Sequence, residues 1–242
     1  MKVFVINLDR NTDRLKAVSE RLRALGIAFE RFPAVDGRAL DAATRRRVHS
    51  RVWTLFARGF GMTPGEIGCT LSHLKVYQKM VDENLDAACI LEDDANPEPG
   101  FAEGLGRIEA QLDASRPQVI LLAPVQYPEP EVPEGLHRLE DAMFADAYVI
   151  TRPAAAAILR ANSPVRCMSD FWGYLKRRAG FELYQFGPVL SRQDFAAFGT
   201  DVRGAKPTCG GTWYWKLWRA FGKTADWLLW KLSRLFVPRF HA

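Results

Sequence analysis

The first 32 residues contain the pattern that most constrains how this chain folds. Residues 3–7, Val-Phe-Val-Ile-Asn, form a short apolar run typical of a strand buried on both faces. A helical pattern covers residues 12–25 and ends at Gly26, and residues 27–32 return to a strand pattern. A strand, a helix and a strand within about 30 residues predict a right-handed βαβ unit, and therefore a parallel sheet.

A second clear helix start follows in the sequence Thr63-Pro64-Gly65-Glu66. Thr63 suits the N-cap, Pro64 the first helical position, and Glu66 closes a capping box. The helix is expected to run to about Asn84 and to lead into a buried strand. Later strands are predicted at 118–122, 147–151 and 182–186, helices at 98–112, 153–161 and 169–179, an irregular basic segment at 41–61, and a proline-rich loop at 124–133.

The composition, 48% hydrophobic and 25% charged over 242 residues, suits one sizeable core. We predict an α/β domain over residues 1–205, with a mostly parallel sheet flanked by helices, and a basic, aromatic helical tail over residues 206–242. Residues 213–242 carry six Lys or Arg residues against one acid. On a helix their apolar and basic side chains separate, which is typical of binding to an anionic membrane surface. The alternative is that the apolar side packs on the α/β domain. Nucleic acid is not an expected partner, because no recognised binding fold is present.

The cysteines and the hydropathy pattern bear on where the chain works. Its four cysteines show no C-x-x-C spacing, which favours a reducing cytoplasm over a disulfide scaffold. No apolar run approaches the ~20 residues that a spanning helix needs. We therefore expect a cytoplasmic protein, peripheral on the inner face of the cytoplasmic membrane if the tail binds lipid. His137 and His241 lack a neighbouring ligand pattern, so no zinc site is predicted there.

Three consecutive carboxylates, Glu92, Asp93 and Asp94, follow the apolar run at residues 87–91. Ligands of open α/β sheets bind at the carboxyl ends of strands, and carboxylates there suit a hard cation, Mn²⁺ or Mg²⁺. Side chains alternate along a strand, so Glu92 and Asp94 are expected on one side and Asp93 on the other. Asp94 is the first candidate for a metal ligand and Glu92 the second. The alternative is that the acids only cap the turn before Pro97.

Four motifs occur in order along the chain and together carry a resemblance. They are Val5-Ile6-Asn7-Leu8-Asp9-Arg10 with Asp13-Arg14, Ala34-Val35-Asp36-Gly37, Gly65-Glu66-Ile67-Gly68-Cys69 with Leu71-Ser72-His73, and Ile90-Leu91-Glu92-Asp93-Asp94. In this order and spacing the motifs resemble those of glycosyltransferase family 25, over roughly residues 3–200. A weaker block at Ala147-Tyr148-Val149-Ile150-Thr151-Arg152 and the carboxylate of Asp170 extend the match.

The resemblance implies a GT-A-like nucleotide-sugar fold and an inverting, metal-dependent hexosyltransferase. The family includes bacterial lipooligosaccharide β-galactosyltransferases and collagen galactosyltransferases. For this chain it implies transfer of a hexose, with galactose expected, from a UDP-hexose to a lipid-linked saccharide in lipopolysaccharide biosynthesis, with Mn²⁺ or Mg²⁺. Two alternatives remain: a catalytically silent module that binds saccharide or membrane, and a metal-dependent nucleotidyl or phosphoryl transferase. The second is disfavoured because no P-loop is present.

The resemblance also assigns roles to individual residues. An inverting transfer needs a base for the acceptor hydroxyl, and Asp170 is the first candidate, with Asp194 and then Asp146 behind it. Gly37, Glu66 and His73 have simpler alternatives as a tight turn, a capping box and a structural histidine. The implied donor-binding residues are Asn7, Leu8, Arg10, Arg14, Asp36, Gly37, Glu66, Ser72, His73 and Asp93.

Overall fold

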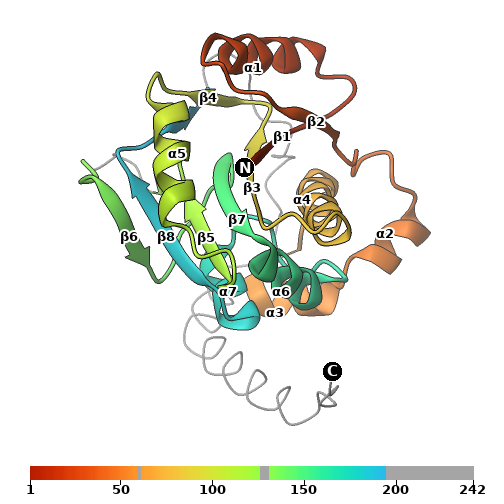
Figure 1. Ribbon diagram of the computed structural model, residues 1–242. Coiled ribbons are helices and arrows are strands. Elements are labelled where there is room, and N and C mark those ends of the chain that lie inside the picture. Colours follow the sequence, from red (N-terminus) through yellow and green to blue (C-terminus); the bar gives the residue numbers. More distant parts are fainter. Residues whose placement is uncertain (59–60, 126–130, 195–242) are drawn as a thin grey trace.

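A mixed β-sheet with helices on both faces forms the centre of the computed structural model, which describes residues 1–58, 61–125 and 131–194 (Figure 1). Across these residues the sheet has seven strands in the order β2-β1-β3-β7-β5-β8-β6. Their bounds are β1 (Lys2–Asn7), β2 (Glu30–Pro33), β3 (Ala87–Glu92), β5 (Gln118–Leu121), β6 (Gly135–Leu139), β7 (Ala147–Thr151) and β8 (Glu182–Gly187).

The strand directions confirm the βαβ unit predicted at the amino terminus. Strand β1 pairs in parallel with β2 and with β3, and helix α1 (Thr12–Ala24) connects β1 to β2. Strand β7 runs antiparallel between β3 and β5, and β6 runs antiparallel to β8 at the edge. The sheet is therefore mixed, with β6 and β7 opposed to the other five strands, and the α/β fold class is confirmed.

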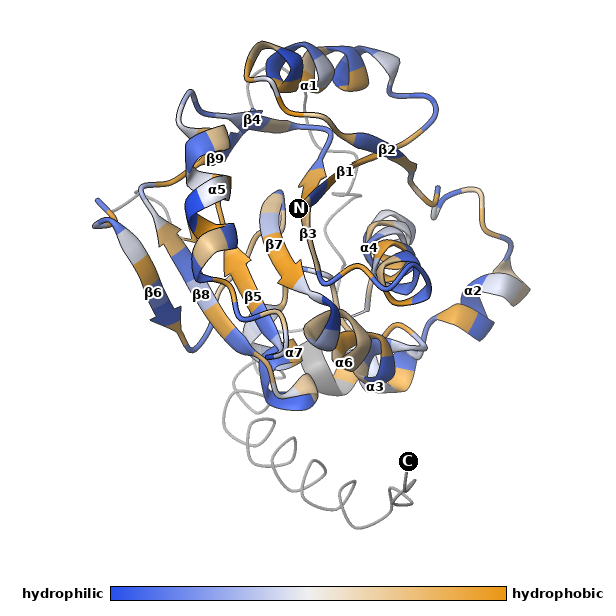
Figure 2. Cartoon of the chain, viewed as in Figure 1, coloured by the Kyte–Doolittle hydropathy of each residue, from blue (hydrophilic) through white to orange (hydrophobic). Residues whose placement is uncertain are grey.

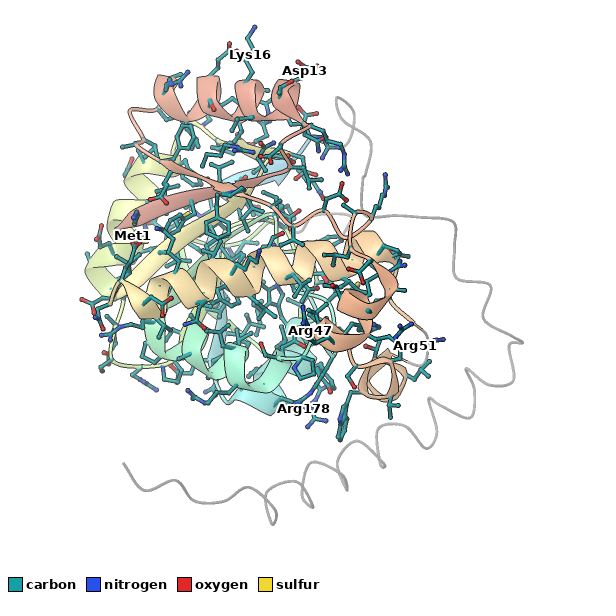
Figure 3. The ribbon with its side chains drawn as sticks, turned by 90° about the vertical axis from the view of Figure 1, so that its right-hand side faces the viewer. Met1, Asp13, Lys16, Arg47, Arg51 and Arg178 are labelled. Carbon is teal, nitrogen blue, oxygen red and sulfur yellow. The ribbon has the colours of Figure 1, made fainter. Side chains whose placement is uncertain are left out.

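The two faces of the sheet bury separate apolar clusters, because neighbouring side chains on a strand point to opposite faces. In β1, Phe4 packs toward one cluster and Val5 toward the other. Helices α4 (Pro64–Asp82), α6 (Arg152–Asn162) and α7 (Trp172–Ala179) supply the first cluster, and α1 and α5 (Phe101–Gln111) the second. The central strands are accordingly apolar along their length (Figure 2). Asp13 and Lys16 lie on the solvent side of α1 (Figure 3).

Helix α4 begins at the capping box that the sequence predicts. Thr63 Oγ1 accepts a hydrogen bond from Glu66 N (3.2 Å), and Glu66 Oε2 accepts one from Thr63 N (2.7 Å). One turn later the helix backbone approaches the loop that follows β2. A Cβ added to Gly68 would lie 2.5 Å from the carbonyl oxygen of Val35 and 2.5 Å from Gly37 N. The two glycines therefore let this loop lie directly on α4.

Several predicted elements differ from the structure. The segment expected to be irregular forms α2 (Ala42–Val48) and α3 (Arg51–Arg58); α2 buries no residue, so it has no apolar periodicity to detect. Strand β2 begins at Glu30 because Ile27 N still bonds the carbonyl of Leu22 at the end of α1 (2.9 Å). Strands β6, β4 (Ala95–Pro97) and β9 (Ser191–Gln193) were not predicted, and β4 and β9 form a separate antiparallel pair.

The predicted domain boundary at residue 205 and the tail over 206–242 lie outside the described residues. Among the residues that are described, no helix is both long and apolar enough to cross a membrane.

Candidate active site

An open cleft lies where β1 and β3 end, and its walls come chiefly from four segments, with Gln193 of β9 beside them. These are the segment after β1, the loop after β2, the amino-terminal half of α4 and the acidic turn after β3. Ten of the fourteen predicted site residues line it: Leu8, Arg10, Arg14, Asp36, Gly37, Ser72, His73, Glu92, Asp93 and Asp94. The lining does not include Asn7, Glu66, Asp170 or Asp194.

The acidic residues occupy the end of β3 and the turn before β4. Glu92 is the last residue of β3, and Asp93 and Asp94 form the turn. The expected alternation, with Asp93 on the far side, is wrong because the pleat ends at Glu92 and all three acids line the cleft. Arg14 Nη1 lies 3.3 Å from Asp93 Oδ1 and 3.9 Å from Asp94 Oδ2. One guanidinium therefore faces both turn carboxylates.

Asn7 acts behind the cleft wall. Its Nδ2 donates to Asp93 Oδ2 (2.8 Å), and Arg31 Nε donates to Asn7 Oδ1 (3.0 Å). The side chain is buried at the end of β1. Asn7 therefore fixes the orientation of Asp93 rather than facing the cleft itself.

Of these carboxylates, Asp94 has the least favourable environment for a negative charge. Burial raises its pKa to about 7, with the charges of Glu92 and Asp93 adding to this, although Gln193 and Arg14 oppose it. Gln193 Nε2 donates to Oδ2 (2.8 Å), while the buried Oδ1 has no hydrogen-bond partner. A buried oxygen without a partner is costly. A hard divalent cation would satisfy Oδ1 and offset the crowded charge, so this group of oxygens fits Mn²⁺ or Mg²⁺.

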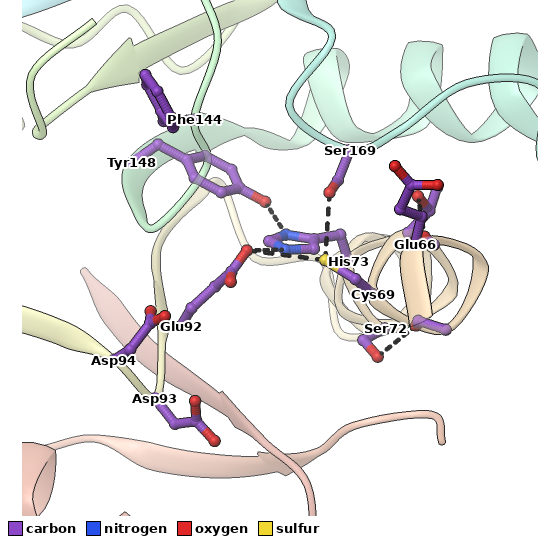
Figure 4. Close-up of polar contacts among 12 residues, drawn as sticks. Glu66, Cys69, Ser72, His73, Glu92, Asp93, Asp94, Phe144, Tyr148 and Ser169 are labelled. Atoms are coloured by element: carbon purple, nitrogen blue, oxygen red, sulfur yellow. Dashed lines mark hydrogen bonds and ion pairs between the residues drawn. The ribbon is translucent and has the colours of Figure 1, made fainter. Parts of the chain in front are cut away.

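Glu92 points toward α4 and meets two side chains of that helix (Figure 4). His73 Nε2 lies 3.1 Å from Glu92 Oε1, and Cys69 Sγ lies 3.8 Å from the same oxygen. On its other side, His73 Nδ1 lies 2.6 Å from Tyr148 Oη, which is 2.6 Å from Tyr77 Oη. His73 is thus buried between a tyrosine pair and the cleft.

Ser72 holds the loop after β2 against α4. Its hydroxyl accepts a hydrogen bond from Val35 N (2.8 Å) and donates to the carbonyl oxygen of Gly68 (2.8 Å). In the same loop, Asp36 forms an ion pair with Arg10, and both line the cleft. Ser72 and Gly37 therefore shape the cleft by backbone placement, whereas Arg10 and Asp36 present charge to it.

The three candidate bases lie beyond the cleft lining. Asp194 forms an ion pair with Arg21 (2.8 Å). Burial raises the pKa of Asp146 to about 8, and the charges of Glu92, Asp94 and Asp170 add to this. Burial, followed by the charge of Glu92, also holds the pKa of the Cys69 thiol well above its usual range, and the charge of Asp170 adds to it. Asp170 therefore lies close enough to the Cys69 side of the site to act on it electrostatically.

Comparison with known proteins identifies the family. The family model described as glycosyltransferase family 25 (LPS biosynthesis protein) matches residues 1–172, which include the whole cleft lining except Gln193. The chain belongs to glycosyltransferase family 25. This membership confirms the resemblance carried by the four motifs and supports glycosyl transfer as the activity.

Three of the relatives that match come from animals. A glycosyltransferase 25 family member of Aedes aegypti is 37% identical over 117 residues, which are 47% of this chain and 19% of the relative. One of Drosophila melanogaster is 39% identical over 114 residues (44% and 18%). Human procollagen galactosyltransferase 2 is 29% identical over 118 residues (48% and 19%). The chain spans about a fifth of the length of these relatives.

Three residues that make contacts in this family 25 site were not among the predicted site residues. Tyr148 lies in the weaker motif block, which was the only signal for it. Cys69 lies in a predicted motif, but site roles were assigned there only to Glu66, Ser72 and His73. Gln193 has no sequence signal, because it ends a three-residue, all-polar strand, Ser-Arg-Gln, that resembles any loop.

Proposed function

We propose that this chain is an inverting glycosyltransferase that transfers a hexose, galactose, from a UDP-sugar to a saccharide hydroxyl. The observation that carries the proposal concerns Asp94, which lines the cleft within the part of the chain that the family 25 model matches. Its buried Oδ1 has no hydrogen-bond partner. Galactose as the hexose is supported by the procollagen galactosyltransferases among the relatives.

The donor half of the cleft suits a nucleoside diphosphate. Asp94 and Glu92 are the residues proposed to hold Mn²⁺ or Mg²⁺. When bound, the cation supplies positive charge that neutralises the leaving diphosphate. Arg14, which is only 14% exposed and already faces two carboxylates, adds a fixed positive charge beside the same position. Arg10 and Asp36 lie farther out along the cleft, where the nucleoside would lie.

Asp170 is the proposed base for the acceptor hydroxyl. Asp146 is a poor base near pH 7, because a carboxyl with a pKa of about 8 is mostly protonated there. The charge of Asp194 is already balanced by Arg21, which makes it the second choice. An Asp170→Asn variant should therefore lose transfer while it retains donor binding, and Asp194→Asn should retain both.

The acceptor and the location are proposed from the family description and from the sequence of residues 213–242. A lipid-linked saccharide is supported by the description of the matched family as LPS biosynthesis proteins. The proposed contact of residues 213–242 with an anionic membrane, on the cytoplasmic side, rests on the charge and apolar pattern of that segment alone.

The test is donor binding with and without metal. The melting temperature of the full chain is measured with UDP-galactose, UDP-glucose or UDP, in Mn²⁺ or in chelator, together with slow hydrolysis of each sugar. We expect UDP-galactose to stabilise the chain most, and only in Mn²⁺. Asp94→Asn should lose the metal-dependent part, whereas Asp82→Asn, an exposed position at the far end of α4, should retain it. The proposal fails if no UDP-sugar changes the melting temperature or is hydrolysed.

A further inference from the structure

Three different metal-ligating side chains converge at the inner wall of the cleft, beside the acidic turn. Cys69 and His73 lie one turn apart on α4, and Glu92 ends the neighbouring strand β3 (Figure 4). Their donor atoms all lie within 4.8 Å of one another. Glu92 is shared with the set proposed for Mn²⁺ or Mg²⁺, but its Oε1 faces Cys69 and His73, whereas Asp93 and Asp94 face Arg14.

Two of the three separations among these atoms are close to those in a tetrahedral site, and the third lies within 4.8 Å. With bonds of about 2.0 Å to nitrogen or oxygen and about 2.3 Å to sulfur, neighbouring ligands of a tetrahedral ion lie about 3.3–3.6 Å apart. The observed separations are 3.1 Å between His73 Nε2 and Glu92 Oε1 and 3.8 Å between Cys69 Sγ and the same oxygen. Shifts of a few tenths of an ångström would bring these two separations to the tetrahedral values. All three residues line the cleft.

The tyrosine pair behind His73 provides the support that metal-binding histidines need. When the Nδ1–H of His73 donates to Tyr148 Oη at 2.6 Å, Tyr148 in turn can donate to Tyr77 Oη at 2.6 Å. This leaves the lone pair of Nε2 directed at Glu92 and Cys69. Such a partner on the second ring nitrogen fixes the tautomer and the ring plane of a metal ligand. The rings of His73 and Tyr148 also stack, with centroids 5.7 Å apart.

We propose that Cys69, His73 and Glu92 form a second metal site, specific for Zn²⁺ or an ion of the same thiophilic class. A sulfur and an imidazole select such ions over Mg²⁺ and Mn²⁺, which the all-oxygen set at Asp94 suits. On binding, the Cys69 S–H bond breaks, its proton passes to solvent, and the sulfur forms the bond to the ion. Glu92 and Nε2 contribute lone pairs, so no oxidant or reductant is required. The site does not depend on glycosyl transfer.

The test uses Co²⁺ as a spectroscopic substitute for Zn²⁺ in the full, metal-stripped chain. We expect an ultraviolet thiolate-to-Co²⁺ charge-transfer band that saturates at one equivalent and disappears when Zn²⁺ is added. Cys69→Ser should abolish the band. Asp94→Asn should retain it, which separates this site from the oxygen site, and so should Cys209→Ser, which controls for another thiol of the chain.

Two results would overturn the proposal: no charge-transfer band in the wild-type chain, or a band that survives unchanged in Cys69→Ser. If Cys69→Ser does not fold, as judged by circular dichroism, Glu92→Gln provides the same test at a side chain that is 23% exposed. Its affinity for Co²⁺, read from the thiolate charge-transfer band, should fall about tenfold or more, since even indirect partners of a metal are worth about tenfold. Unchanged affinity in Glu92→Gln would equally exclude the site.

Discussion

Replacing Asp94 by Asn should make the metal-free chain more stable at pH 8, although the same change removes the proposed response to Mn²⁺. Asn has the shape of Asp, and its amide oxygen can still accept the hydrogen bond from Gln193. What the substitution removes is a buried negative charge next to Glu92 and Asp93. The increase in the free energy of unfolding therefore measures the electrostatic cost of burying the Asp94 charge beside Glu92 and Asp93.

The magnitude follows from the pKa of Asp94. Its value of about 7 in the folded chain compares with an ordinary value of 3.8. Because the folded-state pKa is raised, the wild-type chain loses stability as the pH rises from about 4 to about 7, and the loss is complete above pH 7. At about 1.4 kcal/mol for each pH unit, the full cost is on the order of 4 kcal/mol. Between pH 5 and pH 8 the advantage of the variant should grow by about 2–3 kcal/mol.

Urea unfolding followed by far-ultraviolet circular dichroism measures this difference at pH 5 and pH 8, in chelator. Asp82→Asn is the control, because it is exposed and should stay within about 0.5 kcal/mol of wild type at both pH values. An Asp94→Asn advantage that is equal at the two pH values would refute the reasoning. So would a variant that is less stable than wild type at pH 8.

Three further predictions concern packing, capping and charge. Gly68→Ala should lower the free energy of unfolding by roughly 1–3 kcal/mol in urea, because the added Cβ would meet the Val35 carbonyl oxygen. Gly106→Ala should not lower it, because a Cβ there meets nothing within 4 Å. Equal effects of the two substitutions would contradict this. Thr63→Ala should cost about 1 kcal/mol in the same assay through loss of the α4 N-cap, and a neutral result would exclude that role. Arg14→Met should weaken UDP binding by about tenfold or more in calorimetry, and unchanged affinity would remove Arg14 from the donor site.

Much of the fold was predictable because its signals are local. The strands β1, β3 and β7 are largely apolar, and the capping box at Thr63 marks the start of α4. The elements that were missed have no such signal. Helix α2 buries no residue, and β4 and β9 are three-residue strands that define each other only by pairing. The register Ala95 with Gln193 joins positions far apart in the chain, so no sequence window contains both.

The sequence by itself placed ten of the fourteen predicted site residues at the cleft, because carboxyl ends of parallel strands meet at one edge and the motifs follow those strands. Tertiary structure alone decided what each residue contacts there. The turn after Glu92 breaks the strand alternation, so Asp93 faces Arg14 and Glu92 faces His73. Packing of distant segments brings Gln193 to Asp94. Burial, which raises the pKa of Asp94 to about 7, is a property of the packed chain and not of its residue types.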